Sequence, residues 1–305
     1  MKTTVLTAAL APLFTISLLT SSRAADAPPD PFKLNLPGFS THADATTTGK
    51  SDLKAGGSVS STAYDFAVSQ TIPFGEKASF DVGLSYGEIS LDQSKPNALT
   101  PLPKELRSVS LDLGYSQEIN DTWSLDAGIS PGVHSAGRDF SSKGFGVNGY
   151  ALATYNYSPN LSFSGGLSVN SIGKDLIEPT FVGNWTINDQ WSASVGYPTT
   201  AITYTLSPSW QFSLLAEADG TGGSYYVEKE PLPIAAGRPS LKGSTLDYTE
   251  MRLGLSVNYQ VSPSVGVTLA SGVVVDQQFE YHDPNYKVKS EAGAGYASIA
   301  VNAAF

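Results

Sequence analysis

Residues 251–259 read MRLGLSVNY, and this stretch decides the fold class. Its apolar side chains alternate with small or polar ones, so that Leu253, Leu255 and Val257 are separated by Gly254 and Ser256. In a β-strand, successive side chains point to opposite faces, and a period of two therefore gives one apolar and one polar face. The stretch predicts a β-strand that is apolar on one side only.

The same alternation recurs along most of the chain. We expect thirteen such strands, near residues 54–71, 78–90, 106–118, 123–135, 145–157, 161–172, 176–187, 191–197, 200–206, 210–218, 247–260, 265–279 and 291–305. Apolar residues at helical spacing are hard to find. No segment beyond the N-terminal leader approaches the roughly 18–20 consecutive apolar residues that a membrane-spanning helix needs. The sequence predicts an all-β protein.

The links between the expected strands are of two kinds. Short turns at 120–122, 158–160, 188–190, 207–209 and 262–264 are built from Asn, Asp, Ser and Pro, which favour tight turns. Long links rich in Pro, Gly and polar residues lie near 91–105, 136–144, 219–246 and 281–290. Three short turns are followed at once by tryptophan, namely Trp123, Trp191 and Trp210. This pattern indicates an array of hairpins with short links on one side and long links on the other.

Composition excludes several classes of protein. Charged residues are 15% of the 305 residues, well below the roughly 25% typical of soluble domains. The chain has no cysteine, which rules out disulfides, thiolate metal sites and a cysteine nucleophile. Its net charge of −10 disfavours nucleic acid as a partner, because phosphate recognition needs a basic surface.

The N-terminus predicts export. Lys2 precedes an uncharged, largely apolar run, and Ser22 and Ala24 supply small residues at the positions that a signal peptidase reads. We expect residues 1–24 to be a signal peptide cleaved after Ala24. Residues 25–35 then form a Pro-rich tail, and residues 36–305 form a single barrel domain.

The asymmetric links, with aromatic residues beside the short turns, resemble those of bacterial outer-membrane β-barrels. The last strand ends in Phe305, which looks like the assembly signal of that class. The resemblance implies insertion by the barrel-assembly machinery, contact with outer-membrane lipid, and an aromatic girdle formed by Trp123, Trp191, Trp210 and Tyr259. Within this class the chain is most similar to uncharacterised families of barrels, those built on domains of unknown function. It carries no signature of a named porin or transporter.

The class also constrains the number of strands. Bacterial single-chain barrels have an even number of strands, and the C-terminus lies on the short-turn side. Thirteen strands therefore require one more, for which residues 36–47 are available. We expect a transmembrane antiparallel up-and-down barrel of fourteen strands, with twelve as the next choice.

A closed barrel assigns the two faces of each strand. Closure pairs every backbone N–H and C=O without leaving an edge, as a membrane requires. The apolar faces, including Leu84, Leu111, Ile129, Leu255 and Ile299, should face lipid. The lumen should be lined by Asp65, Asp81, Asp112, Asp126, Arg252 and Asp276, with Ser110, Ser124, Asn258 and Asn302, and with Glu178, Glu217 and Glu250 as further candidates. A soluble two-sheet sandwich, with the same apolar faces packed against each other, is the alternative.

The motifs that would indicate an enzyme have simpler explanations. Residues 83–87 and 128–132 match the hydrolase pattern Gly-x-Ser-x-Gly, but both lie in expected strands with no helix after them. Residues 144–149 match a dinucleotide-binding fingerprint but open no helix. His42, His134 and His282 are not spaced as metal ligands. We therefore predict no catalytic residues, no metal and no cofactor.

The expected inward carboxylates point to a channel. Acidic groups that line a confined aqueous path favour cations. The leading hypothesis is a passive outer-membrane channel or transporter for small hydrophilic solutes, with a preference for cations, in a Gram-negative-type bacterium. A structural or surface-binding barrel with a plugged lumen, and a secreted soluble sandwich that binds a ligand, stay open as alternatives. The link at 219–246 either folds inward as a constriction or projects as a binding surface.

Overall fold

The computed structural model describes residues 38–218, 222–233, 238–291 and 293–305. The expected signal peptide at 1–24 and the expected tail at 25–35 lie outside the described residues. No helix in the described part of the chain has the length and hydropathy to cross a membrane.

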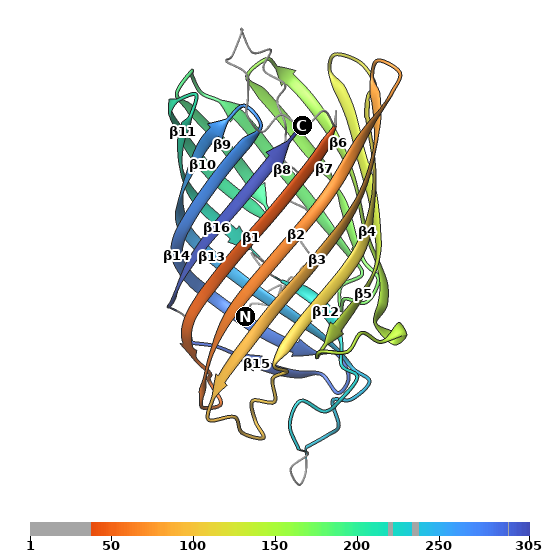
Figure 1. Ribbon diagram of the computed structural model, residues 1–305, viewed down its shortest axis with the longest axis vertical. Helices are drawn as coiled ribbons and strands as arrows, with labels where there is room; N and C mark the ends of the chain where they lie inside the picture. Colours follow the sequence, from red (N-terminus) through yellow and green to blue (C-terminus); the bar gives the residue numbers. More distant parts are fainter. Residues whose placement is uncertain (1–37, 219–221, 234–237, 292) are drawn as a thin grey trace, which may run out of the picture.

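Fourteen strands close into one antiparallel barrel (Figure 1). The strands of the wall are β1 (Phe39–Asp52), β2 (Ser58–Phe74), β3 (Ala78–Ser94), β4 (Glu105–Glu118), β5 (Trp123–Ala136), β6 (Phe145–Ser158), β7 (Leu161–Asn170), β8 (Ile177–Thr186), β9 (Trp191–Tyr197), β10 (Thr199–Ser207), β11 (Trp210–Ala218), β13 (Thr245–Ser262), β14 (Val265–Tyr281) and β16 (Ala294–Ala304). Two short strands, β12 (Gly223–Tyr226) and β15 (Tyr286–Lys289), and one 3-10 turn, Ser142–Gly144, belong to the links. The wall closes where β1 pairs with β16.

The prediction of a fourteen-stranded up-and-down barrel is confirmed, and the soluble sandwich is excluded because the sheet has no second layer. The strand expected at 36–47 is β1, which pairs with β2 from Phe39 onward.

The two ends of the barrel differ as the links predicted. At one end, the upper end in Figure 1, consecutive strands are joined by tight turns, and Phe39 and Phe305 lie there too. We call this the short-turn end and the opposite one the long-link end. A single residue, Pro198, joins β9 to β10 at the long-link end and is the exception to this pattern.

Side-chain capping explains why the short turns form where they do. The Asn120 side-chain oxygen accepts hydrogen bonds from the backbone N–H groups of Thr122 and Trp123, each 2.9 Å long. Asn188 makes the same pair of bonds to Gln190 and Trp191, again at 2.9 Å. These Asn turns satisfy backbone donors locally, and each one starts the next strand at a tryptophan.

The outer wall is apolar across its middle. Leu84, Ile129 and Leu255 are 56%, 52% and 63% exposed, although they are large apolar side chains in regular strands. Their cross-strand neighbours on the same face are apolar as well, as in the pairs Leu84–Leu111 and Leu255–Leu214. A continuous apolar surface of this kind suits lipid rather than water.

Aromatic side chains form a band around the wall at the short-turn end. Three predicted girdle residues each pack on a cross-strand tyrosine: Trp123 on Tyr155 at 4.9 Å between ring centroids, Trp191 on Tyr204 at 4.9 Å, and Trp210 on Tyr259 at 4.5 Å. Phe305 stacks on Phe39 at 6.3 Å, where the barrel closes. Amphipathic rings at this height match the position of a membrane interface.

The long-link end is covered by strands that leave the wall. Residues 245–250 of β13 no longer pair with β11, and residues 245–248 pair with β12 instead; the end of β14 pairs with β15. β12 in turn reaches β5 through the pair Tyr226–Ser135. These strands cross the barrel near its lower end in Figure 1. We call this set the lid: β12, residues 245–250 of β13, residues 275–281 of β14, and β15.

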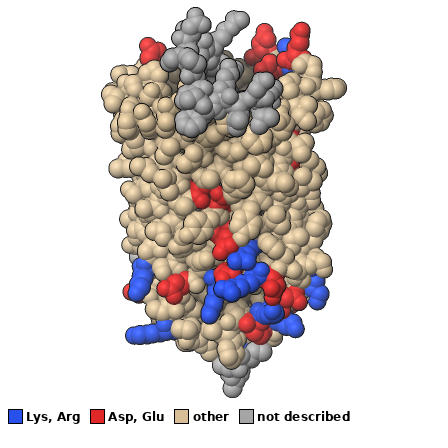
Figure 2. Space-filling model, viewed as in Figure 1, with Lys and Arg blue, Asp and Glu red and all other residues tan. Residues whose placement is uncertain are grey.

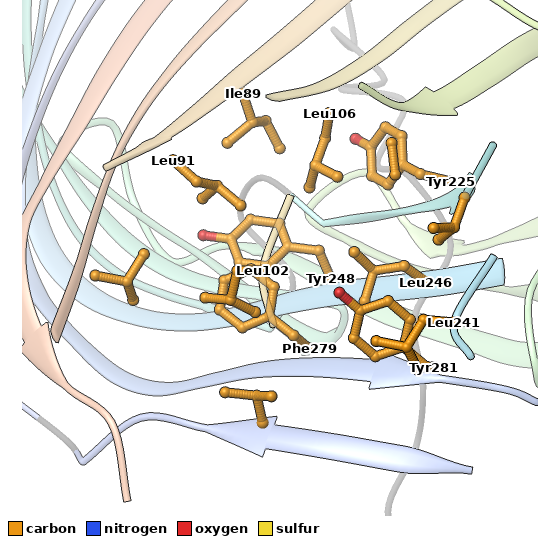
Figure 3. Close-up of a cluster of buried hydrophobic side chains, with 14 of the residues drawn as sticks. Ile89, Leu91, Leu102, Leu106, Tyr225, Leu241, Leu246, Tyr248, Phe279 and Tyr281 are labelled. Atoms are coloured by element: carbon orange, nitrogen blue, oxygen red, sulfur yellow. The ribbon is translucent and has the colours of Figure 1, made fainter. Parts of the chain in front are cut away.

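An apolar core seals the lid to the wall (Figure 3). Its members, which we call the lid core, are Leu53, Val59, Ala63, Ile89, Leu91, Leu102, Leu106, Ala136, Tyr225, Val227, Leu241, Leu246, Tyr248, Phe279, Tyr281 and Val288. Leu246, Tyr248, Phe279 and Tyr281 of the lid are 0% exposed. Burying one such side chain is worth about 1.5–3 kcal/mol, so the lid is held by packing. Val227 and Leu241, on the long link between β11 and β13, are buried in this core as well.

The sequence indicates the lid core through a change in which face of a strand is apolar. On β3 the exposed apolar residues Phe80, Val82 and Leu84 have even numbers, whereas the buried Ile89 and Leu91 have odd numbers. The apolar face therefore switches from outside to inside along a single strand. On β13, Leu253 and Leu255 face outward and Leu246 and Tyr248 face inward. A switch of this kind predicts a packed interior at one end of a barrel.

Candidate functional site: the polar lumen

Most of the predicted lumen residues lie on the inner face of the wall. Cross-strand pairing places Asp65 opposite Gly87, Asp81 opposite Gly114, and Asp112 opposite Gly83. Asp126 pairs with Ser116, and Arg252 pairs with Glu217. All of these positions share the face that carries the lid core further along the same strands.

Asp276 lies elsewhere. It pairs with Met251, which is 45% exposed on the outer wall, because a β-bulge interrupts the β13–β14 ladder beside Met251. A regular alternation counted from Val267 and Leu269 would turn Asp276 inward. The extra residue of the bulge, Val275, reverses the alternation and turns Asp276 to the outer face. Asp276 is therefore not grouped with the lumen residues below.

Water has access to the lumen between the lid and the short-turn end. Asp65 is exposed although it faces inward, and so are Gln211 and Asn302 nearer the short-turn end. Short hydroxyl side chains orient several of the carboxylates. Thr71 donates to Asp81 at 2.5 Å, and Ser130 donates to Asp112 at 2.7 Å. The lumen is thus a hydrated space with fixed negative groups along its wall.

Two tyrosines lie flat against the lumen wall over glycines. A Cβ atom at Gly128 would stand 2.6 Å from the Tyr150 ring, and one at Gly254 would stand 2.2 Å from the Tyr296 hydroxyl oxygen. The missing side chains therefore let both rings lie along the wall instead of across the lumen. Tyr150 lies within electrostatic range of Asp81, Asp112 and Asp126.

Gly128→Ala is expected to displace Tyr150 and to destabilise the barrel by about 1–3 kcal/mol, the usual range for overpacking. Tyr150→Leu should remove most of that penalty, because the three atoms nearest to the added methyl group, at 2.6 to 3.2 Å, all belong to the Tyr150 side chain. Urea unfolding of the two single variants and the double variant would measure the coupling between the two sites. If the changes in the free energy of unfolding of the two single variants add up to that of the double variant, the contact between residue 128 and the Tyr150 ring is contradicted.

A buried polar layer separates the lumen from the lid core. The Arg252 guanidinium donates to one Glu250 oxygen from Nε at 2.9 Å and from a terminal nitrogen at 2.7 Å. Gln277 donates to the other Glu250 oxygen at 2.9 Å and to the Tyr248 hydroxyl at 3.0 Å, and Tyr248 itself donates to Glu250. Arg252 also lies over the Tyr296 ring, 5.0 Å from its centroid. Gln277 had no distinguishing mark in the sequence, because only the lid places it beside Glu250.

The outer face of the lid is fastened by ion pairs. Glu280 binds Lys174 of the β7–β8 link and Lys287 of β15, the latter at 2.6 Å. Asp247 accepts hydrogen bonds from Ser224 at 2.5 Å and from the Lys174 backbone N–H at 3.2 Å, and His282 lies 2.8 Å from it. The hydrogen bond and the charge of Glu280 raise the pKa of Lys174, so this lysine stays charged. The lid is thus held from inside by packing and from outside by charge.

Charged groups otherwise gather at the rims. Figure 2 shows that Lys and Arg on the face in view lie mainly over the long-link end, together with Asp and Glu. Many are paired: Arg107 lies 3.2 Å from Glu88 and 3.2 Å from Glu105, and Lys229 lies 2.9 Å from Asp139. These pairs are exposed or half-buried and contribute little to stability.

The motifs that resemble enzyme signatures fall within the wall. Residues 83–87 lie in β3 and residues 128–132 in β5, where Ser130 donates to Asp112. Residues 144–149 lead into β6 and open no long helix. Across the described residues, no group of three His, Cys, Asp or Glu side chains could hold a metal ion. His42, His134 and His282 are well separated: on the lumen wall, under the lid, and on the outer face of the lid.

The closed wall, its apolar outer surface and its polar lumen define a transmembrane β-barrel of the outer-membrane class. The chain belongs to the DUF6268 family, named for a domain of unknown function, whose model matches residues 36–298. No curated protein matches the sequence.

Several solved barrels align with this chain at low identity. An outer-membrane channel from Pseudomonas putida F1 superposes with a TM-score of 0.47 and 9% identity, covering 92% of this chain and 100% of that chain. A FadL homologue of Pseudomonas aeruginosa gives 0.45 and 11%, covering 88% and 89%. The porin KdgM gives 0.37 and 9%, covering 87% and 99%.

Proposed function

We propose that the protein is a passive outer-membrane channel for small hydrophilic solutes that prefers cations, and that the lid closes it in the present conformation. The observation that carries the proposal is the hydrated lumen with inward Asp65, Asp81, Asp112 and Asp126 on its wall. Charges that only maintained solubility would lie on the rims, where water is abundant. Carboxylates inside a narrow lumen attract cations and repel anions along the whole path.

The lid blocks the lumen at the long-link end and leaves the short-turn end open. In the outer-membrane class, short turns face the periplasm and long links face outward. With that orientation the lumen opens to the periplasm and the lid covers the outer mouth. No covalent chemistry is involved, since the lumen side chains set only the width of the path and its electric field.

A specific observation supports a second candidate, a plugged barrel that acts through its outer surface. The lid core is fully packed, and its central side chains have no access to water. If the lid never moves, the lumen is open only at the short-turn end and solutes cannot pass through the barrel.

Deleting residues 222–240 discriminates between the two functions, because it removes β12 and Val227 and so weakens the lid core. The channel proposal expects a clear rise in conductance in planar bilayers. Deleting residues 138–141 in the β5–β6 link is the control. These residues contribute no side chain to the lid core and meet the β11–β13 link through the exposed Lys229–Asp139 pair, so the conductance should not rise. A deletion variant that folds and stays as silent as the intact protein would favour the plugged barrel.

The preference for cations is tested by the lumen carboxylates. Asp65→Asn and Asp112→Asn are combined in the variant that lacks residues 222–240, which is expected to conduct. The reversal potential in a KCl gradient should move toward zero, because two fixed negative charges are removed from the lumen. Asp276→Asn removes the same kind of group from the outer face of β14 and should leave the reversal potential unchanged. Equal shifts in the two variants would assign the selectivity to the overall charge of the protein instead of to the lumen.

A further inference from the structure

We propose that protonation of His134 opens the lid, so that the channel opens when the water around it becomes acidic. The inference rests on the proposed channel function and deepens it by naming the condition under which the lid moves. The structure describes all three histidines of the chain, and His134 is the one that lies between the wall and the lid.

The ring of His134 is enclosed where β12 meets the wall. The residue is 5% exposed and faces inward, on the same face of β5 as Ala136 of the lid core. Its ring centroid lies 6.5 Å from that of Tyr225 on β12, with 70° between the ring planes. The next residues along each strand, Ser135 and Tyr226, form the backbone pair that joins β12 to β5. His134 therefore lies at the contact that must part when the lid moves.

The buried ring is poorly placed to carry a positive charge. Its Nε2 atom is buried and has no hydrogen-bond partner among the described residues. A neutral imidazole leaves one nitrogen without a proton, whereas an imidazolium has a donor on both nitrogens, and each donor needs an acceptor. The adjacent pair of lid-core residues, Leu106 and Ala136, is apolar. A buried charge without a partner is costly, so the closed lid favours the neutral ring.

This part of β5 lies outside the membrane-spanning segment. His134 is eleven residues beyond Trp123 of the aromatic band. At about 3.3 Å per residue, on a strand tilted by about 35–45°, it is about 26–30 Å above that band, whereas the apolar band is about 25 Å tall. The charged pair Arg107–Glu88 lies on the outer wall at the same level, because Arg107 pairs with Ser135.

Charged side chains lie on the elements around the ring, but none of them shifts its pKa. They are Glu105 and Arg107 on β4, Asp139 and Lys143 on the β5–β6 link, and Glu228 and Lys229 after β12. Arg107 is engaged by Glu88 and Glu105, and Lys229 by Asp139. Burial is the only cause that acts on His134, and it lowers the pKa of the ring to about 4. The ring is therefore neutral at pH 7 while the lid is closed.

The sign of the effect follows from the two states of the lid. When β12 leaves, the ring meets water and regains the ordinary histidine pKa of about 6.5. The open lid therefore binds the proton more tightly than the closed lid, in which the pKa is about 4. The preference for the closed lid is complete above about pH 6.5 and is lost as the pH falls toward 4. At pH 5 the ratio of closed to open lid should be about thirtyfold lower than at pH 8.

The other titratable groups on the outer face of the lid do not predict opening in acid. His282 lies 2.8 Å from Asp247, so its protonation would strengthen that ion pair and hold the lid closed. Burial raises the pKa of Glu280, but the hydrogen bonds and charges of Lys174 and Lys287 outweigh it and hold the pKa below its ordinary value. Glu280 therefore stays charged at pH 5 and keeps both lysines.

Single-channel recording of the full-length protein in planar bilayers at pH 8 and pH 5 tests the proposal. The ratio of open to closed time should rise by about thirtyfold at pH 5. His134→Phe keeps a flat ring beside Tyr225 but takes up no proton, and should abolish the dependence on pH. His134→Gln is a second variant without a titrating group, with the same expected result. His42→Gln removes a histidine from the lumen wall and should leave the acid response intact.

A second measurement follows the lid without conduction. The chain has no cysteine, so Ala63→Cys places a single thiol in the lid core and Ala55→Cys places one on the exposed β1–β2 link. A maleimide reaches position 63 only when the lid opens. The ratio of the two labelling rates removes the effect of pH on thiol reactivity. It should rise by about thirtyfold from pH 8 to pH 5, and stay constant when His134→Phe is added.

Heat-modifiable gel mobility would verify that every variant folds. A labelling ratio that does not change with pH, or an acid response that persists in both His134→Phe and His134→Gln, would overturn the proposal. Acid-dependent labelling that needs His134, in a barrel that never conducts, would remove the channel function and keep the role of His134. Cation-selective conduction with the same open time at both pH values would do the reverse.

Discussion

Phe279→Ala is expected to open the barrel. Phe279 is 0% exposed in the lid core and stacks on Tyr248 with 4.7 Å between ring centroids. Truncating a buried phenylalanine to alanine lowers stability by about 3–5 kcal/mol, because the burial of the removed ring atoms no longer contributes and a cavity remains. The penalty falls on the closed lid, and each 1.4 kcal/mol is worth about a factor of ten in an equilibrium. The ratio of closed to open lid should therefore fall by about two to three and a half orders of magnitude.

Single-channel recording in planar bilayers measures this directly as frequent, long openings in the variant and rare ones in the intact protein. Phe181→Ala is the matched control, because Phe181 is 56% exposed on the outer wall and the same atoms are removed far from the lid. A folded Phe279→Ala protein with conductance no higher than that of the Phe181→Ala protein would show that the lid is not a gate.

Leu255→Arg is expected to cause the largest loss of stability in the wall. Leu255 is 63% exposed on the outer face and lies four residues from Tyr259 of the aromatic band. At about 3.3 Å per residue along a tilted strand, this places Leu255 near the middle of an apolar band about 25 Å tall. Arginine at that depth costs about 2–4 kcal/mol.

Unfolding by urea in lipid vesicles provides the measurement. Ser256→Arg places the same side chain one residue further on, where it faces the hydrated lumen, and should cost far less. Comparable losses at the two positions would contradict the assignment of the faces, and with it the membrane orientation of the wall.

The wall could be predicted from sequence because its signals are local. Alternation such as that of residues 251–259 fixes which face of a strand is apolar, and Asn turns such as Asn120 and Asn188 fix where strands begin. Parity then required a strand before β2, even though β1 has few large apolar residues. These inferences depend only on neighbours in the sequence and on closure of the sheet.

The lid and the position of Asp276 depend on contacts between distant segments. Strand alternation counted through β14 contains no mark of the bulge at Val275, because a bulge is specified by the partner strand as much as by its own sequence. The lid core joins Leu91, Val227, Leu246 and Tyr281, which lie far apart along the chain. The change of apolar face along β3 and β13 was the available clue, and it identifies a packed interior without saying which segment fills it.

The lid strands are continuous with the wall strands β13 and β14, and this continuity restricts how the mouth can open. A detached plug could be expelled, but two paired strands that continue into the wall can only swing about the point where they leave it. The bulge beside Met251 lies at that base, where the ladder is already irregular. Swinging outward as one unit breaks the pairing of Tyr226 with Ser135 of β5 and the hydrogen bond from the Lys54 N–H to the Lys289 carbonyl, which join the lid to the wall. In the channel proposed above, the exposed backbone groups left by that movement would favour the return of the lid to its closed position.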